Sequence, residues 1–176
     1  MSTHEVRDRL QPVLLDRLTD LEPHSRVESD DSRVMNKTQI REAVLRDLSW
    51  LLNSVQPLNK AVAAQYPQAA DSVLNYGLPA MSGQLASRVD VSQLERTIKQ
   101  AILRFEPRVM EDSLEVKALE ASSVLDTHNV IEFEIRGFMW AQPVPLELLL
   151  RTQVDLEAGQ VEVRDAGSSA PSRRKT

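Results

Sequence analysis

The apolar residues of this chain change their spacing near Arg108, and this change constrains the fold more than any other feature of the sequence. Before Arg108 they recur with the period of a helix face, whereas after it they alternate with polar residues, as in half-buried strands. This order predicts a two-layer α+β fold, with N-terminal helices packed on a C-terminal antiparallel meander of about four strands. The strand residues predicted to face inward are Leu114, Val116 and Ala118; Ile131, Phe133 and Ile135; Leu148, Leu150, Val154 and Leu156; and Val161 and Val163.

The first core helix is predicted to begin at Asn36, which forms an N-cap pattern with Gln39. The apolar residues from Ile40 to Val55 then form one stripe along about four to five helical turns. Trp50 lies off this stripe, so it is either covered by a short helix predicted within residues 6–20 or offered to a partner. The covered position is favoured, because the short helix needs a surface on which to pack.

The second core helix is predicted to begin at Ser92, which forms a capping-box pattern with Glu95. Between the two core helices, residues 58–84 show no sustained period and are expected to form a long ordered loop. Gly77 and Gly83 are candidates for turns with positive φ in that loop. No glycine pattern typical of a phosphate-binding loop is present in the sequence.

The second helix is followed by Glu106, Pro107 and Arg108, and this tripeptide is the first candidate functional site. Pro107 cannot continue a helix and disfavours helical dihedrals at Glu106, so an extended tripeptide is predicted. In an extended segment Glu106 and Arg108 project to the same side. Two interpretations remain open at this point. Arg108 either pairs with an acid of its own domain, or forms with Glu106 a two-charge fork that docks another protein.

Length, charge and cysteine content exclude several classes of function. A chain of 176 residues suits one domain, predicted here as residues 1–165, followed by a disordered basic tail at 166–176. The net charge of −5 disfavours nucleic acid as a partner. The chain contains no cysteine, which suits the cytoplasm, and neither a signal peptide nor a membrane span is evident.

The sequence gives no sign of catalysis, so we expect no catalytic residues, no metal site and no cofactor. His4, His24 and His128 are widely separated and show no metal-ligand spacing. Glu132 and Glu134 share one strand face and could imitate the carboxylate pair of a glycosidase. Such pairs normally come from separate elements that flank a cleft, so this role is disfavoured.

Four segments together resemble TssE, the type VI secretion baseplate subunit related to the lysozyme-like wedge protein of contractile-tail phages. The resemblance spans roughly residues 10–165, with the segments in the order of that family. They are Leu15-Asp16-Arg17-Leu18, Leu48-Ser49-Trp50-Leu51-Leu52-Asn53, Ser72-Val73-Leu74-Asn75-Tyr76-Gly77-Leu78-Pro79 and Phe105-Glu106-Pro107-Arg108.

The resemblance implies a structural subunit in a bacterial cytoplasmic baseplate at the inner membrane. It implies binding to the wedge subunits TssF and TssG, to the sheath proteins TssB and TssC, and membership of a larger baseplate that contains TssK. The candidate partner-binding residues are Glu106, Pro107, Arg108, Trp50 and Tyr76. In the family the Glu-Pro-Arg motif carries wedge contacts, which favours the docking interpretation of the tripeptide.

Two other functions are compatible with parts of the sequence. The phage relatives have been described as lysozyme-like, which would make the chain a peptidoglycan hydrolase, but the missing carboxylate cleft argues against this function. The other alternative is a generic cytoplasmic adaptor domain of α+β class.

Overall fold

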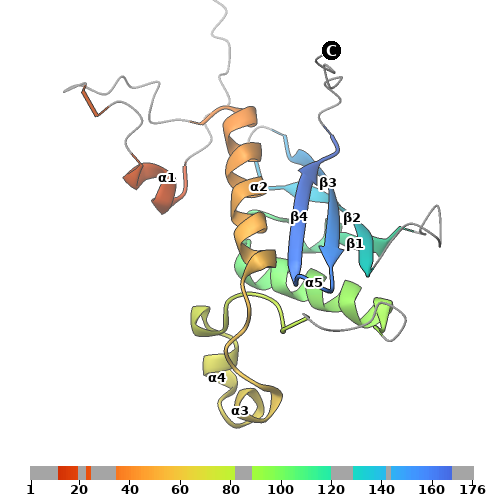
Figure 1. The fold of residues 1–176 in the computed structure, drawn as a ribbon. Coiled ribbons are helices and arrows are strands. Elements are labelled where there is room, and N and C mark those ends of the chain that lie inside the picture. Colours follow the sequence, from red (N-terminus) through yellow and green to blue (C-terminus); the bar gives the residue numbers. More distant parts are fainter. Residues whose placement is uncertain are drawn as a thin grey trace, which may run out of the picture.

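The computed structural model describes residues 12–19, 23–24, 35–81, 89–119, 129–141 and 144–167. In these residues the helices precede the strands, which confirms the predicted α+β class (Figure 1). The elements are α1 (Leu14–Leu18), α2 (Lys37–Asn53), α3 (Lys60–Gln65), α4 (Pro67–Ala70), the 3-10 helix η2 (Val73–Asn75), α5 (Val91–Phe105), the 3-10 helix η4 (Glu111–Ser113), β1 (Glu115–Ala118), β2 (Val130–Met139), β3 (Leu146–Asp155) and β4 (Gln160–Asp165).

The four strands form one antiparallel sheet in the order β1-β2-β3-β4, as expected for a meander. Ile135 in the centre of β2 lies opposite Val116 of β1 and Leu150 of β3. Residues directly opposite on neighbouring strands share a face, so this register places the predicted inward residues in one apolar row. All three side chains are buried.

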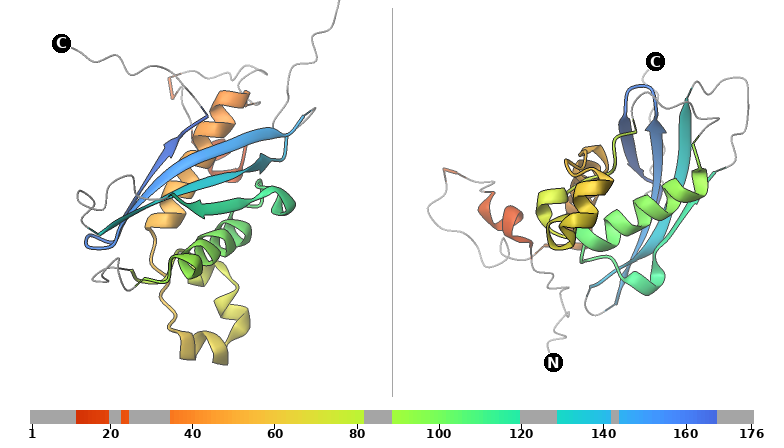
Figure 2. Two further views of the ribbon diagram at one scale, coloured as in Figure 1. Left: turned by 90° about the vertical axis from the view of Figure 1, so that its right-hand side faces the viewer. Right: turned by 90° about the horizontal axis from the view of Figure 1, so that it is seen from below.

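Helices α2 and α5 cover one face of the sheet, with α2 packed on β4 and α5 on β1 (Figures 1 and 2). The apolar stripe of α2 is buried as predicted from Ile40 to Leu52, but Val55 lies beyond the helix end and is 60% exposed. Asn53 attaches the end of α2 to the sheet. Its side-chain amide donates to the carbonyl of Val161 at 2.8 Å and accepts the N–H of Val161 at 2.9 Å. The layers are thus joined by apolar packing and by polar contacts such as this one.

The capping prediction is confirmed for α2 and wrong for α5. Asn36 and Gln39 form the reciprocal capping box at α2. At α5 the N-cap is Asp90, whose carboxylate accepts the N–H of Gln93 at 3.0 Å. The carboxylate of Glu95 instead accepts the N–H of Ala118 at 2.7 Å, so it ties α5 to β1.

The expected long loop at residues 58–84 is wrong for its described part, which contains α3, α4 and η2. These elements project away from the sheet beyond the end of α2 (Figure 1). They are too short for an apolar period to show, although Asn59 caps α3 and Pro67 begins α4. Gly77 has the predicted positive φ, at 115°.

Several predictions fall outside the described residues. These are the start of the short N-terminal helix before residue 12, the turn at Gly83, and the tail beyond residue 167. The short helix itself is present as α1, over Leu14–Leu18. Within the described part of the chain, no helix combines the length and the apolar character needed to cross a membrane.

Candidate functional site

The chain turns sharply at Glu106–Val109, where α5 ends. Glu106 is the C-cap of α5, and its N–H donates to the carbonyl of Ile102 at 2.8 Å. The N–H of Val109 donates to the carbonyl of Glu106 at 3.1 Å. The prediction of an extended tripeptide is therefore wrong. Pro107 occupies the second position of a four-residue turn, where its fixed φ is favourable.

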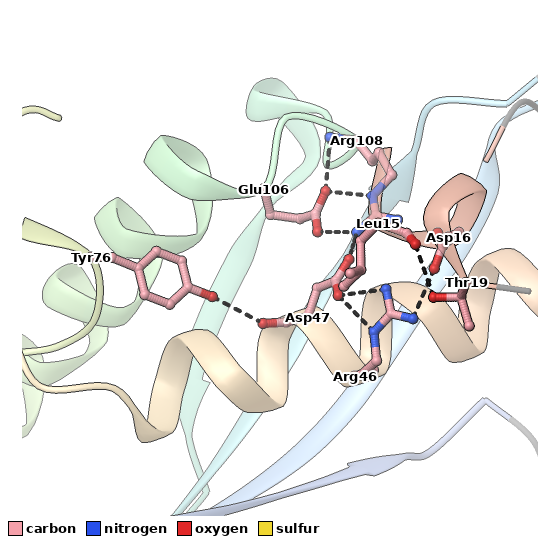
Figure 3. Close-up of polar contacts among 8 residues, drawn as sticks. All are labelled: Leu15, Asp16, Thr19, Arg46, Asp47, Tyr76, Glu106 and Arg108. Atoms are coloured by element: carbon pink, nitrogen blue, oxygen red, sulfur yellow. Dashed lines mark hydrogen bonds and ion pairs between the residues drawn. The ribbon is translucent and has the colours of Figure 1, made fainter. Parts of the chain in front are cut away.

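The side chains of Glu106 and Arg108 bond each other and a third residue, Asp47 of α2 (Figure 3). Oε1 of Glu106 accepts from Nε of Arg108 at 2.7 Å, and Oε2 accepts from Nη2 at 2.5 Å. The same Nη2 donates to Oδ2 of Asp47 at 2.5 Å. The Glu106 side chain is only 5% exposed and the Arg108 side chain 19%. The structure thus shows the internal pairing that the sequence left as one of two interpretations.

Asp47 continues the network toward the N-terminal helix. Its Oδ1 accepts from Nε of Arg46 at 2.9 Å, and Nη1 of Arg46 donates to Oδ1 of Asp16 in α1 at 2.8 Å. The Asp16 side chain is 5% exposed, whereas Leu14 and Leu18 of the same helix are 71% and 73% exposed. Helix α1 is therefore attached to α2 by charge rather than by burial of its leucines. We call Asp16, Arg46, Asp47, Glu106 and Arg108 the ionic cluster.

Tyr76 joins the cluster from a further segment. Its ring lies edge-on to Phe105 with 5.1 Å between ring centres, and its hydroxyl donates to the backbone carbonyl of Asp47 at 3.4 Å (Figure 3). Gly77 allows this approach, since a Cβ at that position would lie 2.3 Å from the carbonyl oxygen of Ser54. The glycine therefore brings the Tyr76 segment against the end of α2.

Trp50 lies one helical turn beyond Asp47 on α2, and the guanidinium of Arg46 is 5.2 Å from the centre of its ring. The Trp50 side chain is 52% exposed. The favoured prediction, that the short N-terminal helix covers Trp50, is therefore wrong. Helix α1 contacts Arg46 through Asp16 instead, and no residue of α1 is buried.

The carboxylates of the ionic cluster favour the charged forms of its two arginines. Burial acts to lower the pKa of Arg108, but its bonds to Glu106 and Asp47 outweigh this effect and raise the pKa above its ordinary value. The pKa of Arg46 is raised in the same way by Asp16 and Asp47, against the effect of burial. Burial, followed by the charges of Asp47 and Glu106, raises the pKa of the Tyr76 hydroxyl.

Few groups in or beside the ionic cluster remain available to bind another molecule. Nη1 of Arg108 forms no hydrogen bond with any residue that the structure describes. The ring of Pro107 is exposed, as is that of Trp50. The arrangement can therefore present one charged N–H edge beside apolar rings, but its carboxylates already accept bonds from arginines.

The metal-binding and catalytic candidates of the sequence can be located in part in the structure. No group of three or more His, Asp or Glu side chains there could hold a metal ion. Glu132 accepts a 2.7 Å bond from Gln153, and Glu134 a 2.6 Å bond from Arg136, so both candidate carboxylates already have hydrogen-bond partners on the sheet. His4 and His128 lie outside the described residues.

Asp16, Arg46 and Asp47 were missed as site residues by the sequence analysis. Arg46 and Asp47 are adjacent, opposite charges between two buried positions of α2, Val44 and Leu48. Such a pair close to the buried face of a helix is the signal that could have identified them. Asp16 belongs to the first segment that resembles TssE, but its partner lies 30 residues away in the sequence.

The class that this fold and site define is a small α+β structural domain, whose internal charges hold separate segments together. The family model described as baseplate wedge protein gp25 matches residues 38–144, which is more than half of the chain. The chain belongs to this family of TssE- and gp25-like baseplate wedge proteins. Comparison with curated proteins and with solved structures gives no match. The matched range includes Asp47, Tyr76, Glu106 and Arg108 but not Asp16.

Family membership supports a structural role in a baseplate, together with other baseplate components. It favours this role over the hydrolase and over the generic adaptor domain, since the family is one of structural baseplate proteins.

Proposed function

We propose that this chain is the TssE subunit of a type VI secretion baseplate. In this proposal it acts in the bacterial cytoplasm at the inner membrane and joins wedge subunits to the contractile sheath. Its wedge partners are TssF and TssG, its sheath partners are TssB and TssC, and the larger assembly contains TssK. It has no hydrolase activity.

The observation that carries this proposal is the ionic cluster. The four segments that resemble TssE are distant in the sequence, yet each contributes to the cluster or lies against it. The first provides Asp16 and the last Glu106 and Arg108, while Tyr76 and Trp50 come from the other two. The resemblance therefore falls on one structural unit rather than on four unrelated surface segments.

We place the wedge contact at the exposed rim of this cluster. The two-charge fork is replaced in this proposal, because Glu106 is buried and already neutralises Arg108. Nη1 of Arg108, which has no hydrogen bond to a described residue, is suited to a carbonyl or carboxylate oxygen of the partner. Pro107 and Trp50 supply apolar contact area, and Tyr76 supports the rim from within.

A binding assay with purified TssF–TssG complex from the same genome tests this function. Wild-type chain should bind, and Trp50→Ala and Pro107→Ser should each weaken binding about tenfold. Melting curves should show both variants folded, with a small loss of stability for Pro107→Ser because the proline fixes φ in its turn. Tyr66→Ala is the matched control, because Tyr66 is 55% exposed between α3 and α4 and is not part of the cluster. Absence of wild-type binding would contradict the proposed function, and equal binding by all variants would contradict the proposed rim.

A further inference from the structure

Residues 108–110 extend the sheet beyond β1 by pairing with the end of β2. The N–H of Trp140 donates to the carbonyl of Arg108 at 2.7 Å, and the N–H of Met110 donates to the carbonyl of Phe138 at 2.8 Å. The two bonds flank an antiparallel bridge whose central residues point into the core. The side chains of Met110, Phe138 and Trp140 then point outward, because successive residues of an extended segment alternate between faces. Arg108 lies in the turn that begins this segment, and its side chain bonds Asp47 instead.

Three large apolar side chains accordingly lie on the outer side of this pairing. Met110 is 39% exposed, Phe138 47% and Trp140 62%. We call them the Phe138 surface. Clustered exposure of this kind is typical of binding sites, since a single exposed apolar residue is ordinary but a contiguous group is not.

Carboxylates border the Phe138 surface on two sides. Glu111 and Asp112 follow Met110 in η4, and η4 is held against β2 because Ser113 Oγ accepts the N–H of Phe138 at 2.9 Å. On the other side, Glu147 of β3 lies directly opposite Phe138. All three acidic residues are exposed, and we call them the acidic border.

The acidic border forms no ion pair with any cation that the structure describes, although Arg41 donates to the backbone carbonyl of Glu147 at 2.8 Å. Among the described residues, none of its three carboxylates forms a salt bridge or a side-chain hydrogen bond. The charge of Glu147 contributes to raising the pKa of Arg136, but Arg136 donates its Nε–H to Glu134. The border therefore presents three carboxylates without a direct ion-pair partner around exposed apolar side chains.

We propose that the Phe138 surface binds a basic amphipathic helix of a wedge subunit. Apolar residues of that helix would cover Met110, Phe138 and Trp140, and its lysines or arginines would meet the acidic border. The assignment to a wedge subunit rests on the proposed function, whereas the chemistry of the occupant rests on this surface alone. An anionic membrane would be repelled by the acidic border.

Another segment of this chain fits the surface less well. The C-terminal sequence Arg173-Arg174-Lys175 has the required charge, but residues 168–176 include no large apolar side chain. It could satisfy the acidic border and leave the three apolar side chains exposed. A helix from another protein can satisfy both.

Two synthetic helical peptides of about 18 residues test the surface directly. Each carries leucine on one face, and the other face carries lysine in one peptide and glutamate in the second. Full-length chain should bind the lysine peptide only, and Trp140→Ala should weaken that binding about tenfold. Glu147→Gln should weaken it several-fold, since it removes one charge of the border.

Matched control variants distinguish binding at the Phe138 surface from nonspecific peptide binding. Leu74→Ala removes a side chain that is 70% exposed on η2, and Glu157→Gln removes an exposed charge in the β3–β4 turn; neither should change binding. Equal binding of both peptides, or equal binding by Trp140→Ala and wild type, would overturn the proposal.

Neutralising Arg173, Arg174 and Lys175 in the full chain should also have no effect on peptide binding. Much tighter peptide binding by that variant would identify the tail as the occupant and overturn the proposal.

Purified TssF–TssG complex tests the identity of the partner. Trp140→Ala should weaken binding of that complex with no change in the melting curve. If the lysine peptide binds as expected but TssF–TssG binding is insensitive to Trp140→Ala, the assignment to TssF or TssG is wrong. If wild-type chain fails to bind TssF–TssG at all, the proposed function fails, while the peptide result still decides whether the surface binds a basic helix.

Discussion

The ionic cluster and the Phe138 surface meet at Arg108, and they differ in whether their carboxylates are paired with arginines of the same chain. In the ionic cluster each carboxylate accepts a bond from an arginine of the same chain. Around the Phe138 surface, three carboxylates have no such partner among the described residues, and the apolar side chains between them are exposed. The comparison teaches that a charged motif contributes first to folding when its groups are already paired. A surface whose groups lack partners is the better candidate for binding.

The largest expected effect comes from Arg108, which holds two carboxylates of the ionic cluster. Arg108→Ala should lower the free energy of unfolding by about 3 kcal/mol, because it leaves the buried Glu106 without its counter-charge. The control is Arg164→Ala, since Arg164 and its partner Glu162 are 64% and 55% exposed. This variant should cost at most about 1 kcal/mol. Urea denaturation measures both, and equal losses would show that the cluster adds no more than a surface pair.

A smaller effect is expected at Asp16, which attaches α1 to the ionic cluster. Asp16→Ala should lower the free energy of unfolding by about 1 kcal/mol, because Arg46 is partly exposed and keeps its bond to Asp47. The loss should be local, since α1 buries none of its residues. Hydrogen exchange at the N–H of Thr19, which donates to the carbonyl of Leu15, should accelerate while exchange in α2 stays unchanged. Equal acceleration in both helices would contradict a local role.

The smallest expected effect is a difference in pH dependence at Tyr76. Its pKa in the folded chain is raised above the ordinary value of 10.0, so folding disfavours its ionised form. The corresponding stability is fully present below that value and is lost as the pH rises through the folded pKa. Wild type should therefore lose more stability than Tyr76→Phe between about pH 8 and about pH 11. Parallel curves for the two proteins would contradict a partly buried hydroxyl beside Asp47 and Glu106.

The elements that could be predicted from the sequence are those in which burial of one face imposes a period. Helix α2 and the four strands bury one side along their length, so the positions from Ile40 to Leu52 and around Ile135 were predicted correctly. The short helices α3 and α4 show no period, because four to six residues make little more than one turn. Local hydrogen bonds, such as the cap at Asn59, decide their structure.

The ionic cluster was predictable only in part. The family resemblance predicted the importance of Glu106, Pro107 and Arg108. It did not predict the direction in which the side chains of Glu106 and Arg108 point. That direction depends on Asp47, which is 61 residues from Arg108 and approaches it only because α2 and α5 pack on the same face of the sheet. The adjacent charges of Arg46 and Asp47 could have marked this position of α2, but no local pattern identifies Arg108 as the partner of Asp47, because that pairing is a property of the tertiary structure.

A double-mutant cycle between Asp47 and Arg108 tests the central claim, that Arg108 joins the end of α5 to α2. The free energy of unfolding is measured for wild type, Asp47→Ala, Arg108→Ala and the double variant. Because the two side chains share a 2.5 Å charge-assisted bond, their effects should be non-additive by about 2 kcal/mol. Additivity within about 0.5 kcal/mol would show that Arg108 does not bind α2 in solution, and would restore the interpretation of a charge held free for a partner.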